Sequence, residues 1–262
     1  MAADRPWALV TGASSGLGSD FARQLAARGW NVILTARRRD RMEALAVGLR
    51  DTHKAEVEIL DGDLGLPEFR DQLVAQATAG RHVQMIINNA GFGQQGKFLD
   101  GDYGRWADML ALNIAALTDL SYRLGRHMRE HGKPSHVVNI ASIGAFQPVP
   151  AFAVYAATKS YVRDFSEAFA FEVTGSNVAV TCVCPGGTRT EFMEAAGMTL
   201  TKAADAALQS SESVVREALD TALGGGRLVV TGWLNKLATF LTRLSPRWLS
   251  AKVAEFTMRP PS

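Results

Sequence analysis

The chain has 262 residues, of which 47% are hydrophobic, 21% are charged and 8% are aromatic. These fractions are close to the globular average, and they exclude a disordered, collagen-like or fibrous chain. The 28 lysines and arginines against 26 aspartates and glutamates leave a formal net charge of +2. So small a charge argues against nucleic acid as a partner.

The two cysteines, Cys182 and Cys184, are too few for a disulfide framework. They lie two positions apart in an apolar run, so in a strand they share one face, and we expect two packed thiols rather than a redox pair. The first six residues lack the apolar stretch of a signal peptide, and no uncharged apolar segment reaches the roughly 18 residues of a membrane span. We therefore expect a soluble, cytoplasmic protein.

Short apolar runs alternate with helical patterns along the chain. The predicted strands are residues 7–11, 31–35, 56–60, 84–87, 136–140, 178–184 and 227–230. The predicted helices are residues 19–28, 40–50, a segment beginning at Pro67, 103–130 and 153–173. In the helix at 103–130, one face is apolar and carries Leu110, Ile114, Leu117, Leu124 and Met128.

The strands are continuously apolar, which indicates a sheet covered on both faces. Repeated strand–helix units then predict an α/β fold, a Rossmann-type doubly wound parallel sheet of about seven strands flanked by helices. No linker interrupts residues 1–230. We predict one domain over residues 1–231, with a substrate lid at about 186–212, followed by a helical extension over residues 232–262.

The first predicted strand leads directly into Thr11-Gly-Ala-Ser-Ser-Gly-Leu-Gly18, which opens the first helix. Glycines at 12, 16 and 18 let the backbone turn sharply and let a pyrophosphate approach without meeting a Cβ. The helix N-terminus supplies free N–H groups for that anion. An ordinary glycine-rich turn is the alternative, but the position between strand and helix favours a dinucleotide site.

The end of the second strand indicates which dinucleotide binds. An NAD site places an acidic residue there to bind the ribose hydroxyls, whereas this chain has Ala36 followed by Arg37 and Arg38. A guanidinium binds a 2′-phosphate with two hydrogen bonds, so the sequence favours NADP(H) over NAD(H). A solvated, basic helix start is the alternative, and it suits Arg39 and Arg41 better than the first two arginines.

Tyr155 and Lys159 are four residues apart on one predicted helix, so their side chains share a face. A nearby ammonium, together with the positive charge of an oxidised nicotinamide, is expected to lower the tyrosine pKa from its usual value of about 10. Tyr155 would then act as a general acid or base for a carbonyl–alcohol pair, and Ser142 could bind the same oxygen. The alternative is a lysine that lies over an aromatic ring at the surface.

The whole set of motifs resembles the classical short-chain dehydrogenase/reductase family over residues 7 to about 190. The shared motifs are Thr11-Gly-Ala-Ser-Ser-Gly-Leu-Gly18, Asp63-Leu64, Asn88-Asn-Ala-Gly91, Asn113, Ser142, Tyr155-Ala-Ala-Thr-Lys159 and Pro185-Gly186 with Thr188. The resemblance implies four catalytic residues, which are Asn113, Ser142, Tyr155 and Lys159. It implies a cofactor site made by Gly12, Ser14, Ser15, Gly16, Leu17, Gly18, Asp63, Leu64, Asn89, Ala90, Gly91, Tyr155, Lys159, Pro185, Gly186 and Thr188, with Arg37 and Arg38 added on the charge argument above.

The resemblance also implies how these residues work. Asn113 would hold a water that links Lys159 to solvent, and Lys159 would bond the nicotinamide ribose. The expected activity is NADP(H)-dependent interconversion of a ketone and an alcohol, with Tyr155 as the general acid or base. The family commonly pairs through the helices that carry Asn113 and Tyr155, so a homodimer or homotetramer is expected. The alternatives are a cofactor-binding sensor or interaction protein without turnover, and a lipid carbonyl reductase held at a membrane surface.

Two segments beside the expected site are rich in apolar residues, which predicts a lipophilic ketone or alcohol as substrate. The first segment contributes Phe146, Pro148, Val149 and Phe152, and the lid contributes Phe192, Met193, Met198 and Leu200. The alternative is that half of these residues only pack the lid against the domain.

Residues 233–244 and 247–256 form two amphipathic helical stretches separated by Pro246. Lysines and arginines alternate there with Trp233, Trp248 and several leucines and phenylalanines, a pattern that suits a helix lying in a membrane interface. The same pattern also suits packing on a partner subunit or over the active site.

His127 and His131 have a spacing that can hold zinc, with His136 nearby. No glutamate follows His127 directly, so we expect no metal site. A solvated, basic helix C-terminus is the preferred interpretation.

Overall fold

Seven parallel strands form the centre of the protein. A computed structural model describes residues 5–197 and 208–258. The strands are β1 (Trp7–Thr11), β2 (Asn31–Thr35), β3 (Val57–Ile59), β4 (Val83–Asn88), β5 (Ser135–Ile140), β6 (Val178–Cys184) and β7 (Leu228–Val230). Their order across the sheet is β3-β2-β1-β4-β5-β6-β7, and every pairing is parallel. This confirms the predicted doubly wound sheet.

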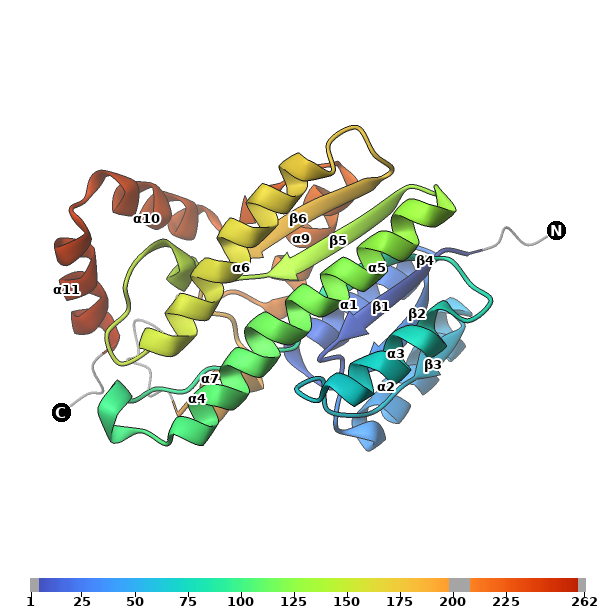
Figure 1. Cartoon of the computed structure of the whole chain (residues 1–262), viewed down its shortest axis with the longest axis horizontal. Helices are drawn as coiled ribbons and strands as arrows, with labels where there is room; N and C mark the ends of the chain where they lie inside the picture. Colours follow the sequence, from blue (N-terminus) through green and yellow to red (C-terminus); the bar gives the residue numbers. More distant parts are fainter. Residues whose placement is uncertain (1–4, 198–207, 259–262) are drawn as a thin grey trace.

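Helices cover both faces of the sheet (Figure 1). They are α1 (Gly16–Ala27), α2 (Arg39–His53), α3 (Pro67–Thr78), α4 (Tyr103–Leu110), α5 (Leu117–His131), α6 (Ala153–Glu172), α7 (Glu191–Ala195), α9 (Ser211–Leu223), α10 (Trp233–Leu244) and α11 (Arg247–Met258). Short turns of 3₁₀ helix lie at η1 (Phe98–Asp100) and η3 (Ile143–Phe146). Among the described residues, no helix is both long and apolar enough to cross a membrane.

Side chains alternate along each strand between two buried clusters, one on each face of the sheet. On β1, Val10 packs on one face with Phe21 of α1 and Leu219 of α9. Leu9 packs on the other face with Leu124 of α5. Because both faces are buried, both sets of strand positions must be apolar, which explains the continuous apolar runs.

The chain leaves the sheet centre in two opposite directions, since β1 lies between β2 and β4. The connections after β1 and after β4 therefore diverge at the carboxyl ends of these strands, where open α/β sheets bind their ligands. The glycine loop after β1 and the Asn88–Gly91 segment after β4 meet at this point.

The predicted continuous helix at 103–130 is wrong in its middle. A π turn, η2 (Ala111–Ala116), separates α4 from α5. Its extra residue breaks the apolar face, so Trp106 and Met109 are buried while the expected Leu110 is 42% exposed.

Two helices were missed by the sequence analysis. The short α7 lies at residues within the expected lid, and α9 packs on α1 and against β6. The lid was predicted to extend to about residue 212, but α9 already begins at Ser211. Residues 211 and 212 therefore belong to a helix that packs on the core and not to a lid. Met198 and Leu200, predicted to line the substrate pocket, lie outside the described residues.

The two thiols pack as expected, since Cys182 and Cys184 are buried and free with their sulfur atoms 3.8 Å apart. Mutual hydrogen bonding and burial raise the pKa of Cys182 well above its usual value. A high pKa leaves little thiolate, so this pair is chemically quiet.

Candidate functional site

A cavity of about 720 Å³ opens at the carboxyl ends of the central strands. It is lined by residues from both halves of the sheet, including the loop after β1, the end of β2, the segment after β4, and the starts of η3 and α6. All of the predicted site residues line it except Gly18 and Asn113. Gly18 and Asn113 are buried behind its wall.

The glycine loop needs its glycines for two separate reasons. Gly12 and Gly16 have positive φ angles of 65° and 52°, which side chains disfavour. A Cβ on Gly18 would lie 2.2 Å from the carbonyl oxygen of Gly12, so the third glycine lets α1 approach the loop closely. Ser15 starts α1 without a side-chain cap, and the first N–H groups of the helix are therefore left for an anion.

Arg38 lies over this loop. Its guanidinium donates to the hydroxyl of Ser14 at 3.1 and 3.2 Å and to that of Ser15 at 2.8 Å. It also forms an ion pair of 3.0 Å with Glu191, at the start of α7 in the lid. Arg41 pairs with the second oxygen of the same carboxylate at 2.5 Å. Two arginines thus hold one anionic group beside the phosphate loop.

The other two arginines of the cluster differ from this pair. Arg37 is exposed and lines the cavity. Arg39 points to Glu43 and Asp61 in exposed ion pairs, as the alternative of a solvated helix start expected. Arg41 is also exposed, as that alternative expected, but it shares Glu191 with Arg38.

Asn89 ties the segment after β4 to the glycine loop. Its amide donates to the carbonyl oxygens of Thr11 at 2.9 Å and of Gly12 at 3.4 Å. Thr11 in turn accepts from the backbone N–H groups of Asn89 and Ala90, each at 2.9 Å. These four bonds fix the two loops that form the floor of the cavity.

Ser142 and Tyr155 meet on the opposite wall. Ser142 follows β5, and its hydroxyl accepts from the N–H of Gly144 at 3.1 Å. Burial raises the pKa of Tyr155 to about 12, although the nearby Ser142 hydroxyl lowers it in part. In the chain alone, the phenol is therefore a proton donor and not a phenolate.

The pKa of Tyr155 is raised in the chain without cofactor, whereas the sequence analysis expected Lys159 and an oxidised nicotinamide together to lower it. The Lys159 ammonium donates to the carbonyl oxygen of Ile140 at 2.8 Å, and it lies 5.8 Å from the centre of the Tyr155 ring. Burial lowers the pKa of Lys159 itself to about 8. Burial is the main cause of both pKa changes, because it disfavours the charged ammonium of Lys159 and the charged phenolate of Tyr155.

Asn113 lies in the π turn, and its side chain is fully engaged. Its amide donates to the Phe92 carbonyl at 3.0 Å and to the Thr158 hydroxyl at 3.1 Å, and its oxygen accepts from the Phe92 N–H at 3.1 Å. A Cβ on Gly91 would lie 2.9 Å from that oxygen and 3.6 Å from the Lys159 nitrogen. Gly91 therefore lies between Asn113 and Lys159, and a side chain at this position would contact both of them.

The far end of the cavity is apolar. It is lined by Val149, Phe152, Phe192 and Met193, which were predicted there. Phe146 and Pro148, also predicted there, are not among the lining residues. Phe146 instead packs into the core beneath Arg163. The rings of Phe152 and Phe192 flank Tyr155, with centroids 5.7 and 5.5 Å away.

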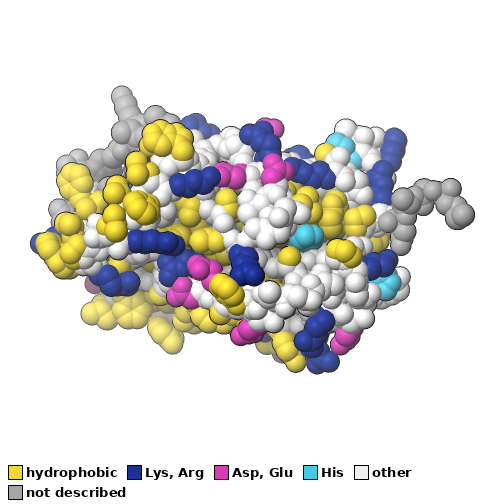
Figure 2. Space-filling model, turned by 90° about the horizontal axis from the view of Figure 1, so that it is seen from above, with side chains coloured by type: hydrophobic (Ala, Val, Ile, Leu, Met, Phe, Trp, Pro, Cys, Tyr) yellow, Lys and Arg dark blue, Asp and Glu magenta, His cyan; other side chains and the backbone are white. Residues whose placement is uncertain are grey.

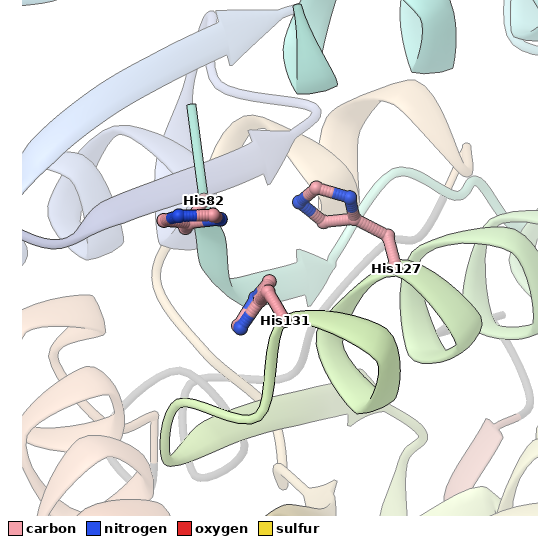
Figure 3. A group of neighbouring side chains, drawn as sticks. All are labelled: His82, His127 and His131. Atoms are coloured by element: carbon pink, nitrogen blue, oxygen red, sulfur yellow. The ribbon is translucent and has the colours of Figure 1, made fainter. Parts of the chain in front are cut away.

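Three histidines gather away from this cavity, at the start of β4 (Figure 3). The sequence analysis missed His82 and expected the other two to be solvated. Instead, His127 accepts a hydrogen bond from the N–H of Val83 at 3.2 Å. His131 bonds the carbonyl oxygen of Val83 at 3.1 Å. His131 also accepts from the N–H of Lys133 at 3.1 Å. Both ring nitrogens of His131 are used in these bonds, and His127 and His131 together cap the start of β4.

Comparisons with known proteins agree with this geometry. The sequence profile of the short chain dehydrogenase family matches residues 6–200. Sulfoacetaldehyde reductase 2 of Chromohalobacter salexigens is 33% identical over 191 residues, which cover 70% of this chain and 73% of that protein. The very-long-chain 3-oxoacyl-CoA reductase of Mus musculus is 26% identical over 255 residues, which cover 94% of this chain and 78% of that protein.

The fold also matches solved structures. A short-chain dehydrogenase from Sphingobium yanoikuyae, solved in complex with NADPH, superposes with a TM-score of 0.81 at 29% identity. The match covers 92% of this chain and 97% of that one. The residues that match the family profile include the glycine loop, Ser142, Tyr155 and Lys159.

Proposed function

The chain belongs to the short-chain dehydrogenase/reductase family of oxidoreductases, and we propose that it interconverts a lipophilic ketone and its alcohol with NADP(H). The observation that carries the proposal is that Ser142 and Tyr155 line the same cavity as the glycine loop. A hydroxyl pair in this position can bind a carbonyl oxygen while a cofactor lies on the loop.

The residues around the glycine loop fit a dinucleotide. Gly12 and Gly16 have positive φ angles, and the first N–H groups of α1 have no side-chain cap, so the loop can accept a pyrophosphate. When bound there, the nicotinamide would supply the hydride in reduction or accept it in oxidation. The chain supplies the position of the substrate and the path of the proton.

In the reductive direction, Tyr155 donates its hydroxyl proton to the carbonyl oxygen as the carbon gains the hydride. Its raised pKa of about 12 keeps the phenol protonated until that step. Ser142 orients the same oxygen by hydrogen bond. Lys159, charged below its pKa of about 8, favours the phenolate that forms and returns a proton to it from solvent through the water proposed near Asn113.

Glu191 supports the preference for NADP(H). Arg38 and Arg41 already bind an anionic group at the end of β2, where an NAD site would have a carboxylate instead. The 2′-phosphate of NADP(H) would take the place of the Glu191 carboxylate, and the guanidinium groups of Arg38 and Arg41 would bind it.

The experiment that tests the proposal compares the wild type with Tyr155→Phe on a panel of ketones, monitored at the nicotinamide absorbance. We expect the variant to lose at least a hundredfold in kcat, which is about the contribution of a general acid. Binding of NADPH, measured by its fluorescence, should change little. Lipophilic ketones should react better than small hydrophilic ones.

Two outcomes contradict the proposal. If the wild type binds NADPH but turns over no ketone or alcohol in the panel, the chain is a cofactor-binding sensor or interaction protein. If Tyr155→Phe retains wild-type turnover, the proton comes from another group. Equal activity on hydrophilic and lipophilic ketones would remove the substrate class alone.

A further inference from the structure

The helix α10 turns its polar side to the protein and its apolar side outward. Its inward residues are Asn235, Thr239 and Thr242, of which Thr239 is buried and the other two are half-buried. The amide of Asn235 donates to Gln209 at 3.2 Å, and the hydroxyl of Thr239 donates to the Asn235 carbonyl at 2.9 Å. The outward residues are each 50% to 72% exposed, and they are Trp233, Leu234, Leu237, Phe240, Leu241 and Leu244.

The helix α11 also turns its large apolar side chains to solvent, and it packs small residues against the protein. Ser250 and Ala254 are buried, whereas Trp248, Val253 and Phe256 are 63%, 54% and 80% exposed. A surface helix of a globular protein normally faces its apolar stripe inward. The outer surfaces of α10 and α11 thus form one apolar face, here called the tail face, at one end of the molecule (Figure 1).

Basic side chains are interspersed in the tail face (Figure 2). Residues 233–256 contain Lys236, Arg243, Arg247 and Lys252 against the single acidic Glu255. Arg243 and Arg247 have no ion-pair partner in the described part of the chain, and both are exposed. Lys252 lies over the Trp248 ring at 5.4 Å. Apolar side chains, tryptophans and unpaired cations together match the interface of an anionic bilayer.

The inner side of α11, opposite to the tail face, borders the substrate end of the cavity. Ala254 packs in one cluster with Val149 and Phe152, and Tyr155 and Phe192 lie against that cluster. Asn235 approaches Gly186 so closely that a Cβ there would lie 2.2 Å from its amide nitrogen. The helix α11 therefore lies between the catalytic wall and a bilayer bound to the tail face.

We propose that the tail face binds the surface of an anionic phospholipid bilayer, with its apolar side chains at the boundary of headgroups and acyl chains. The helices lie on the membrane, since neither is long enough to cross it. A second copy of the chain suits the tail face less well. A two-fold contact would enclose Arg243 and Arg247 of both copies in one interface, and charged residues are depleted at interface cores.

The test is flotation of the full chain with vesicles of phosphatidylcholine, either pure or containing phosphatidylserine. We expect binding to the anionic vesicles, weaker binding to neutral ones, and release at high salt. The variants Leu244→Asp and Phe240→Asp should each lower the partition coefficient by about tenfold, because each replaces a membrane-facing apolar group by a charge. Arg243→Glu with Arg247→Glu should remove the preference for anionic lipid.

The matched control is Phe171→Asp, which changes an equally exposed aromatic residue on α6, outside the tail face. It should bind vesicles as the wild type does. Circular dichroism and NADPH binding show that each variant is folded. Failure of the wild type to float with either vesicle overturns the proposal, as does an equal loss in the control. A dimer that Leu244→Asp dissociates, without wild-type vesicle binding, assigns the tail face to self-association instead. None of these readouts depends on ketone turnover.

Discussion

Glu191 illustrates how one residue links the lid to the cofactor end of the cavity. Its carboxylate lies between Arg38 and Arg41, and these arginines lower its pKa by hydrogen bonding, so it is charged at neutral pH. A 2′-phosphate bound by the same arginines must displace it. The start of α7 is thus held to the glycine loop by an internal anion that competes with the phosphate we propose there.

We predict that Glu191→Gln strengthens binding of NADPH by about two- to fivefold, the range expected for an exposed ion pair. Binding of NADH, which lacks the 2′-phosphate, should not change. The dissociation constants of both cofactors, measured by fluorescence titration, check this. A gain for NADH as large as that for NADPH would show that Glu191 restricts the cavity as a whole.

The buried Lys159 should make the stability of the protein depend on pH. Its pKa is lowered to about 8 from about 10.5, so the folded protein binds fewer protons here than the unfolded chain does above pH 8. Stability from this group therefore rises as the pH rises through 8 toward 10.5. Between pH 7.5 and 9, the gain is about 1 kcal/mol.

The measurement is urea denaturation at both pH values for the wild type and for Lys159→Met. The variant keeps the length of the side chain but cannot titrate, so its free energy of unfolding should rise by about 1 kcal/mol less over the same interval. Identical pH dependence in the two proteins would mean that the ammonium is solvated in the folded state.

At the scale of elements, the glycines of two helices have opposite roles. A Cβ on Gly18 of α1 would collide with the Gly12 carbonyl and the Asn89 amide, at 2.2 and 2.7 Å. We predict that Gly18→Ala costs about 1–3 kcal/mol in the free energy of unfolding, as overpacking does, and weakens NADPH binding by displacing the loop.

Gly48 of α2 is the matched control, because it is exposed and a Cβ there would meet nothing within 4 Å. Gly48→Ala should raise the free energy of unfolding by about 0.5–1 kcal/mol and leave NADPH binding unchanged. Thermal and urea denaturation of both variants check the pair. If Gly18→Ala were also stabilising, the close approach of α1 to the loop would not be required.

The strands and helices differ in how well the sequence predicts them. The strands were predicted to within a residue at either end, since burial on both faces imposes an apolar run that is visible locally. The helix α9 was missed although it starts with a Ser210 cap and buries Val215 and Leu219. The π turn was also missed, because one inserted residue leaves the composition of a helix unchanged.

The missed parts of the site depend on contacts between distant positions. Arg38 was predicted from its place after β2, but its partner Glu191 is 153 residues away. His82 joins His127 and His131 only because β4 starts beside the end of α5. The amphipathic tail was predicted as well, yet only the packing of Asn235, Thr239 and Ser250 shows that its apolar side faces outward. Sequence patterns reveal an apolar face, whereas packing decides what covers it.

For the whole molecule, a net charge of +2 conceals two basic regions, one at the cofactor end and one on the tail face. The first should be visible in global stability, because a ligand that binds only the folded state stabilises the entire chain. At about 100 times its Kd, NADPH should raise the free energy of unfolding by about 2.7 kcal/mol. A tenfold weaker ligand at the same concentration should add only about 1.4 kcal/mol.

We predict that NADPH raises the midpoint of thermal unfolding by at least about 3 °C more than NADH does at equal concentration, given the scaling for a chain of this size. Arg38→Leu should remove that difference, because a charged hydrogen bond to phosphate contributes about 1.5–3 kcal/mol. Arg39→Leu should keep it, since Arg39 pairs with Glu43 and Asp61 away from the loop serines. Equal shifts with both cofactors in the wild type would instead mean that the arginines serve only to hold Glu191 and the lid.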